Sequence, residues 1–271
     1  MTLLDFDFMR RALLAAVVVG MIAPAIGVFL VQRRLALLGD GMGHVALTGV
    51  GLAFLTGSAP IPTALLVVIA GAIGIEVLRG RSRSAGDVIL ALVFYGGIAG
   101  GVLLTYLAGN RAASSLNQYL FGAITTVSST DLVWLLGAAL ALLAILAVFG
   151  REMFAVSFDP EVARTQGIRT GFIGVLITIL AAVTVVIGMR TVGLLLVSAI
   201  MIVPIAAAQQ VTRSFRGTAA LGVLIGLVSA VGGVVASYYL DVPSGATIVL
   251  IAIAFFVGSL GLAAAGVRRS A

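Results

Sequence analysis

Two ionisable side chains, Asp40 and His44, lie four residues apart inside an otherwise apolar stretch of the sequence. On an α-helix this spacing places both side chains on one face. A carboxylate oxygen beside an imidazole nitrogen is a ligand pair that suits a borderline divalent cation such as Zn²⁺ or Mn²⁺. Two ligands are too few for a closed site, so the pair would form a transient stop that water or a second subunit completes. A packed Asp–His hydrogen bond is the alternative reading of the same pair.

The segment 157–167 carries the signals of a short helix. The Asp159 carboxylate can accept hydrogen bonds from the free N–H groups of a helix start, and Pro160 suits the first helical position. Glu161 adds negative charge at the positive end of the helix dipole, and Gly167 can adopt the left-handed conformation that ends a helix. We therefore predict about two helical turns, which are marginal alone and need a packing partner. The helix would either lie on the membrane surface or dock onto a partner protein.

Pro204 is the third feature, because it falls in the middle of an apolar run and is followed by small residues. A proline inside a helix removes one backbone hydrogen bond and kinks the helix. The alanines that follow permit close contact with a neighbouring helix. We therefore expect Pro204 to act as a hinge, in a helix that borders a pathway through the protein.

The amino-acid composition indicates the class of protein in which these residues lie. Hydrophobic residues make up 61% of the 271 residues and charged residues 10%, and the mean hydropathy is +1.24. Soluble domains are about 45–50% apolar and about 25% charged, so a soluble globular protein is excluded. The absence of cysteine excludes disulfides and thiolate metal sites, and the single histidine excludes a site built from several histidines. The chain is therefore predicted to be an all-α polytopic membrane protein.

Apolar runs long enough to cross a bilayer, about 20 residues each, divide the chain into nine predicted spans. They fall at roughly 12–31, 36–56, 61–78, 87–108, 131–149, 171–188, 192–210, 218–237 and 244–264. The second is the least regular, since it contains Asp40 and His44. We treat 1–271 as one transmembrane domain with a cytoplasmic loop at 150–170.

The positions of the basic residues indicate how the chain is oriented in the membrane. All of them are arginines, and they lie in small clusters between the apolar runs, which argues against a nucleic-acid partner. If the C-terminus is cytoplasmic, alternation places Arg33, Arg34, Arg79, Arg81, Arg83, Arg151, Arg164, Arg169, Arg213, Arg216, Arg268 and Arg269 inside, and Arg10, Arg11, Arg111 and Arg190 outside. The positive-inside rule supports this orientation, with the N-terminus outside.

The sequence contains no phosphate-binding loop of the G-x-x-x-x-G-K-[ST] type. Any ATPase that powers transport must therefore be a separate chain. A nucleophile with its base, or a zinc site with several protein ligands, is also missing, so we do not expect an enzyme. A secondary transporter driven by an ion gradient is an alternative, but no clear inverted repeat is visible.

Several motifs, in this order, give the chain a family resemblance. They are Gly27-Val28-Phe29-Leu30-Val31-Gln32-Arg33-Arg34, Leu38-Gly39-Asp40 with His44 and Leu47, Tyr119-Leu120-Phe121-Gly122, Ser157-Phe158-Asp159-Pro160-Glu161 with Ala163 and Gly167, Val192-Gly193-Leu194-Leu195 through Pro204, and Asp241 with Pro243-Ser244-Gly245. Together they resemble the membrane permease subunit of bacterial ATP-binding-cassette (ABC) importers for zinc or manganese. The resemblance covers nearly the whole chain.

The resemblance implies a homodimer in the bacterial plasma membrane, with a fold like that of the vitamin B12 and siderophore permeases but with fewer spans. Asp40 and His44 match the family's metal contacts in the channel. The segment with Asp159, Pro160, Glu161, Ala163 and Gly167 matches the coupling helix that contacts two separate ATPase subunits. An extracellular or periplasmic metal-binding protein would deliver the ion. Zinc or manganese would be cargo, ATP would bind the partner, and no cofactor would stay bound.

Two departures reduce the number of candidate ligands. Some zinc permeases carry an acid directly after Tyr-Leu-Phe-Gly, where this chain has Ala123, and some carry a histidine in the fourth span, where it has Val93-Phe94-Tyr95. The remaining carboxylate and imidazole suit Zn²⁺, Mn²⁺ or Fe²⁺. A permease of the same architecture for a siderophore or a cobalamin is the nearest alternative, and it would not need the Asp40 and His44 pair.

Overall fold

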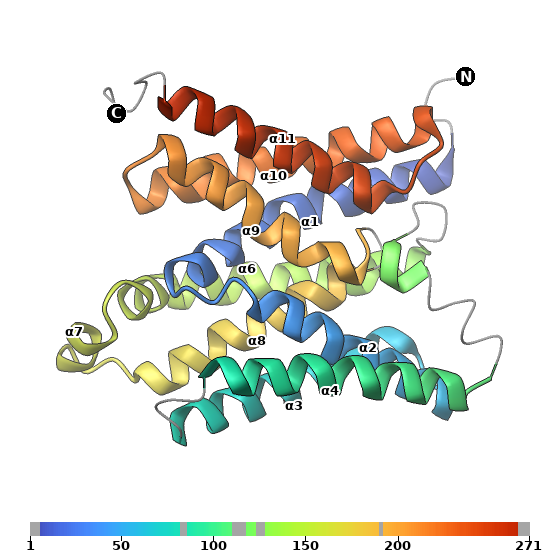
Figure 1. The fold of residues 1–271 in the computed structure, drawn as a ribbon, viewed down its shortest axis with the longest axis horizontal. Coiled ribbons are helices and arrows are strands. Elements are labelled where there is room, and N and C mark those ends of the chain that lie inside the picture. The colour runs from blue at the N-terminus through green and yellow to red at the C-terminus, as the bar shows by residue number, and fades with distance from the viewer. Residues whose placement is uncertain (1–5, 82–85, 110–117, 123–127, 190–191, 265–271) are drawn as a thin grey trace.

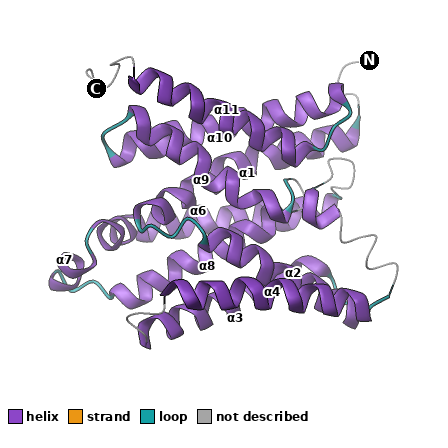
Figure 2. Ribbon diagram, in the orientation of Figure 1, coloured by secondary structure: helices purple, strands orange, loops and turns teal. Residues whose placement is uncertain are grey.

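The computed structural model describes residues 6–81, 86–109, 118–122, 128–189 and 192–264. Within them the secondary structure is helical (Figure 2). The helices are α1 (Asp7–Gln32), α2 (Leu38–Thr56), α3 (Pro60–Arg81), α4 (Gly86–Leu107), α6 (Ser129–Phe158), α7 (Pro160–Thr165), α8 (Thr170–Gly188), α9 (Leu194–Val211), α10 (Phe215–Leu240) and α11 (Ser244–Ala264). Among the residues singled out above, Arg83, Arg111, Ala123, Arg190, Arg268 and Arg269 lie outside the described part.

Eight of the described helices are long and apolar enough to cross a membrane, and α9 contributes a shorter apolar stretch, Leu196–Val211. The prediction of an all-α polytopic membrane protein with about nine spans is therefore confirmed. α9 is short because Gly193 adopts a left-handed φ of 93° just before it, and an extended Thr212 ends it.

The long helices run side by side along the long axis of the molecule and alternate in direction (Figure 1). At the end marked by α7 lie the last residues of α1, α3, α6, α9 and α11 and the first residues of α4, α8 and α10 (Figure 1). α1 begins at the opposite end from the one where α11 finishes, as an odd number of crossings requires. The predicted cytoplasmic arginines of these described helix ends therefore gather at the α7 end.

Glycines let three central helices touch at the backbone. A Cβ built on Gly27 of α1 would lie 1.8 Å from the carbonyl oxygen of Met201 on α9. Similarly, a Cβ on Gly20 would lie 2.9 Å from the Gly226 carbonyl oxygen on α10. Small residues at such contacts are the usual means of tight helix packing in membranes. The α1–α9–α10 unit forms the support on which the candidate site rests.

We expect Gly27→Ala to lower the thermal stability of the purified protein, because the new methyl group would meet backbone that no rotamer change can move away. Overpacking of this kind costs about 1–3 kcal/mol. Gly137→Ala on α6 is the matched control, since its Cβ would meet nothing within 4 Å. Thermal unfolding in detergent measures both variants, and equal melting temperatures would contradict the packing described here.

A partly buried ionic cluster fixes the chain between α1 and α2. The Arg33 Nη2 atom lies 3.7 Å from Glu76 Oε1 on α3, and Arg79 Nη1 lies 3.4 Å from Glu76 Oε2. Thr178 on α8 donates a 3.4 Å hydrogen bond to the same carboxylate. Burial lowers the pKa of Arg33, and the adjacent Glu76 opposes that shift. The cluster ties α3 and α8 to the start of segment 33–37.

Candidate metal site

Both predicted ligands lie in the first two turns of α2. Segment 33–37 runs from the end of α1 toward the middle of the molecule before α2 begins (Figure 1). Asp40 and His44 therefore lie within the bundle rather than at its end. An ionisable side chain at such a depth is costly unless it is satisfied, which makes it a functional candidate by default.

The Asp40 carboxylate is bound by α9. Ser198 Oγ donates a hydrogen bond to Asp40 Oδ1. Gly39 makes this approach possible, because a Cβ there would lie 3.1 Å from Ser198 Cβ. Sequence reasoning missed Ser198, and the available signal was a lone hydroxyl in the apolar run that leads to Pro204.

The His44 side chain is 9% exposed and faces α4. Its ring lies edge-on to Phe94, with ring centroids 4.2 Å apart and an interplanar angle of 73°. Gly97 lets α4 come this close, since a Cβ there would lie 2.6 Å from the His44 carbonyl carbon. Within the described residues, His44 Nδ1 is buried and has no hydrogen-bond partner. An unsatisfied buried nitrogen of this kind is costly, and a metal ion or a water molecule would satisfy it.

A cavity of about 450 Å³ adjoins the pair, between the segment that leads into α2 and the second and third turns of α4. Its wall is formed by Arg34, Leu35, Ala36, Leu37, Leu38, Asp40, Leu90, Ala91, Phe94 and Tyr95. Asp40 is thus in contact with the cavity, whereas His44 is behind the Phe94 ring. The position of the fourth span where some zinc permeases have histidine is in this chain part of the cavity wall.

The arrangement offers one carboxylate, one imidazole and one hydroxyl to a cation. Within the described residues, no group of three or more His, Cys, Asp or Glu side chains lies close enough to hold a metal ion. The structure therefore brings Asp40 and His44 into one neighbourhood without forming a closed site. Such a set suits an ion that pauses with part of its water shell.

Pro204 lies buried inside α9, six residues beyond Ser198. It is on the same helix as the hydroxyl that holds Asp40, so a change of bend at this proline would move Ser198 relative to α2. The role of Pro204 as a hinge remains a prediction.

The loop predicted to be cytoplasmic forms the capped helix that its sequence indicates. Asp159 Oδ1 accepts hydrogen bonds from the backbone N–H groups of Glu161 at 2.9 Å and Val162 at 3.1 Å. Pro160 occupies the first turn, and Gly167 has a φ of +80°. α7 has six residues, slightly fewer than predicted, and the buried Ala163 anchors it to the bundle.

Three of the resemblance motifs meet at the opposite end of the molecule. A Cβ on Gly193 would lie 2.4 Å from the Phe121 carbonyl carbon. A Cβ on Gly245 would lie 1.9 Å from the Val192 carbonyl oxygen and 2.9 Å from that of Phe121. These motifs therefore specify a junction of closely packed backbones rather than a ligand site.

Comparison with known proteins gives a family match. The profile of the ABC 3 transport family matches residues 5–263. The manganese transport system membrane protein MntC of Listeria monocytogenes is 32% identical over 259 residues, which cover 95% of this chain and 92% of MntC.

Two solved structures resemble the fold. PsaBC from Streptococcus pneumoniae in complex with Fab matches with a TM-score of 0.86 at 31% identity, covering 95% of this chain and 92% of that one. A metal-chelate type ABC transporter in an inward-facing conformation matches with a TM-score of 0.76 at 17% identity, covering 93% and 85%. The second match bears on the fold alone, and it agrees with the predicted likeness to chelate importers.

Proposed function

Because the chain belongs to the ABC 3 transport family, we propose that it carries a free divalent metal ion past Asp40 and His44, with manganese as the preferred cargo. The chain is the membrane permease subunit of an ABC importer and is not itself an enzyme. ATP hydrolysis belongs to a separate ATPase subunit, which drives the alternating access of the permease.

The observation that carries the proposal is the pair of polar groups one helical turn apart. The Asp40 carboxylate is in contact with a cavity, and the buried Nδ1 atom of His44 lacks a partner among the described residues. A purely structural pair would satisfy itself through an Asp–His hydrogen bond at that nitrogen. Instead, Asp40 accepts from Ser198, which leaves His44 Nδ1 available.

The donor set supports manganese as the first cargo to test. Carboxylate and hydroxyl oxygens suit Mn²⁺, whereas imidazole suits zinc and iron as well. Asp40 and Ser198 supply two oxygen atoms against one nitrogen from His44. The relative MntC is named as a manganese transport protein, which agrees with this preference. Zinc and iron are the competing cargoes.

We assign one kind of protein partner to each end of the molecule, in addition to a second copy of the chain. We infer a homodimer with a central pathway, in which the second copy faces the cavity beside Asp40. Two ATPase subunits would contact α7 on the cytoplasmic side, where the described arginine clusters gather, and a metal-binding protein would deliver the ion at the opposite end, with the N-terminus outside. Permeases of this class are multi-pass proteins of the bacterial membrane.

We expect cells that express the complete transporter to accumulate free Mn²⁺ but not the same metal held in a siderophore-type chelate. The cavity beside Asp40 has a volume of about 450 Å³, and its wall includes the charged side chains of Asp40 and Arg34. The Asp40 carboxylate is the group in this wall that attracts a hydrated cation. Uptake of labelled metal with excess unlabelled Mn²⁺, Zn²⁺ or Fe²⁺ ranks the cargoes.

The same uptake should stop when the ATPase subunit is inactivated. Transport by the permease alone, driven by an ion gradient, would favour a secondary transporter. Uptake of the chelate in preference to the free ion would favour a siderophore or cobalamin permease.

A further inference from the structure

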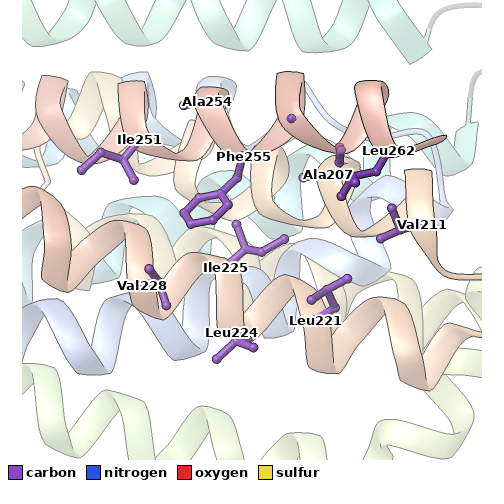
Figure 3. A pocket seen from close by; sticks show the side chains of 12 residues that line it. Ala207, Val211, Leu221, Leu224, Ile225, Val228, Ile251, Ala254, Phe255 and Leu262 are labelled. Carbon is purple, nitrogen blue, oxygen red and sulfur yellow. The ribbon is translucent and has the colours of Figure 1, made fainter. Parts of the chain in front are cut away.

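A second cavity lies between α9, α10 and α11, away from Asp40 and His44 (Figure 3). Its volume is about 750 Å³, and its wall is apolar apart from the Ser259 hydroxyl. That hydroxyl donates a 2.7 Å hydrogen bond to the Phe256 carbonyl oxygen within its own helix. The wall therefore offers only hydrocarbon surface to an occupant.

The cavity is a groove that is open to the side of the molecule. Small residues contribute to its wall, among them Ala207 on α9 and Ala254 and Gly258 on α11. Larger side chains on its rim are exposed, with Leu224 at 55% and Leu262 at 52%. In a bilayer the space beside such a rim is hydrocarbon, so an apolar chain would fill the groove without loss of any hydrogen bond.

The length of the groove matches one leaflet. It extends along α11 from Ile251 to Leu262, and the eleven helical steps between these residues correspond to about 16 Å at 1.5 Å per residue. One leaflet contributes about half of the roughly 30 Å hydrocarbon core. Figure 3 shows Ile251 and Val228 toward one end of the groove and Val211 and Leu262 toward the other. One acyl chain of a lipid has the shape that this groove requires.

Positive charge lies beside the end of the groove that is nearer the α7 side. Arg213 follows the lining residue Val211 by two positions, and Arg216 precedes the lining residue Leu221 by five. Both arginines are exposed and form no ion pair within the described residues. The positive N-terminus of α10, a helix of 26 residues, begins between them at Phe215.

We propose that this groove binds an anionic phospholipid, with one acyl chain between α10 and α11 and the headgroup phosphate beside Arg213 and Arg216. Arginines at a membrane surface attract anionic headgroups, and a helix N-terminus adds backbone N–H donors. The proposal rests on the membrane location of the chain and not on the identity of the transported metal.

Fluorescence quenching of a tryptophan placed in the groove tests the proposal on the full-length protein. Phe255→Trp lies in the groove wall, and Trp134→Phe removes the single native tryptophan. The protein is reconstituted in phosphatidylcholine vesicles with brominated acyl chains on either phosphatidylglycerol or phosphatidylcholine. We expect the anionic lipid to associate with the Phe255→Trp reporter more tightly, on the order of tenfold.

Two sets of substitutions then test separately the positive charge beside the groove and the space within it. Arg213→Gln with Arg216→Gln should abolish the preference for the anionic lipid, while Arg151→Gln with Arg169→Gln, which removes the same charge elsewhere on that side, should keep it. Gly258→Phe should fill the groove and lower quenching by both lipids, and its Cβ would meet nothing within 4 Å.

Two results would overturn the proposal. Equal quenching by both lipids, at the Phe255→Trp reporter and at a Leu140→Trp reporter on the exposed face of α6, would mean ordinary annular lipid. Quenching at Leu140→Trp without quenching at Phe255→Trp would mean that protein, such as a second copy of the chain, covers the groove. Metal uptake is not measured, so failure here leaves the proposed transport function untouched.

Discussion

Asp40→Asn and His44→Ala are each expected to lower Mn²⁺ uptake by about 10–100-fold or more, because removal of even an outer-shell partner of a metal ligand costs that much in metal proteins. Asp40→Asn preserves the shape of the side chain and its ability to accept from Ser198 Oγ. The loss would therefore report on negative charge rather than on packing. Uptake of labelled Mn²⁺ by cells that express the complete transporter measures it.

Two controls separate a transport defect from a folding defect. Asp241→Asn makes the same chemical change at an exposed position at the end of α10, where asparagine tolerates the left-handed φ of 54°. It should leave uptake unchanged. Both site variants should reach the membrane and retain the ATPase subunit. Normal uptake in both Asp40→Asn and His44→Ala would remove these residues from the pathway.

Ser198→Ala provides a graded comparison. The hydroxyl donates to a charged acceptor, and such hydrogen bonds contribute about 1.5–3 kcal/mol. If Ser198 orients the Asp40 carboxylate for the cation, its loss should weaken uptake less than Asp40→Asn does.

Local sequence rules predicted the features that depend on neighbours along the chain. Asp40 and His44 share a helix because their spacing and the apolar run around them belong to one element. Asp159 caps α7 because a carboxylate two or three residues before free N–H groups finds them without help from the rest of the fold. The order of apolar runs similarly anticipated the crossings of the bundle.

Contacts between distant segments could not be predicted in this way. Ser198 meets Asp40 across 158 positions of sequence, and Phe94 meets His44 because Gly97 lets α4 approach. A count of apolar residues also does not show that segment 33–37 turns inward, or that Arg33 at its start pairs with Glu76 on α3. These features arise from tertiary packing, and a single sequence carries no signal of it.

Replacement of the exposed apolar side chains beside and on α7 is expected to separate the permease from its ATPase. Phe158 is 71% exposed and Val162 is 51% exposed, although Ala163 between helix and bundle is buried. Apolar side chains that project from a short, capped helix at the proposed cytoplasmic end are suited to a partner's pocket. If they are central to that interface, Phe158→Asp with Val162→Asp should weaken association by at least about 2 kcal/mol, roughly 30-fold.

Copurification of the ATPase with the tagged permease measures this loss, and uptake should fall with it. Val242→Asp is the matched control, since Val242 is 41% exposed in the connection between α10 and α11 at the opposite end. It should leave the ATPase bound. A helix that merely lies on the membrane surface would tolerate Phe158→Asp and Val162→Asp with the ATPase still bound. The two kinds of variant should therefore differ in ATPase binding. Phe158→Asp with Val162→Asp should lose the ATPase because the change acts on coupling, whereas Asp40→Asn should keep the ATPase and lose metal transport because the change acts on the cargo site.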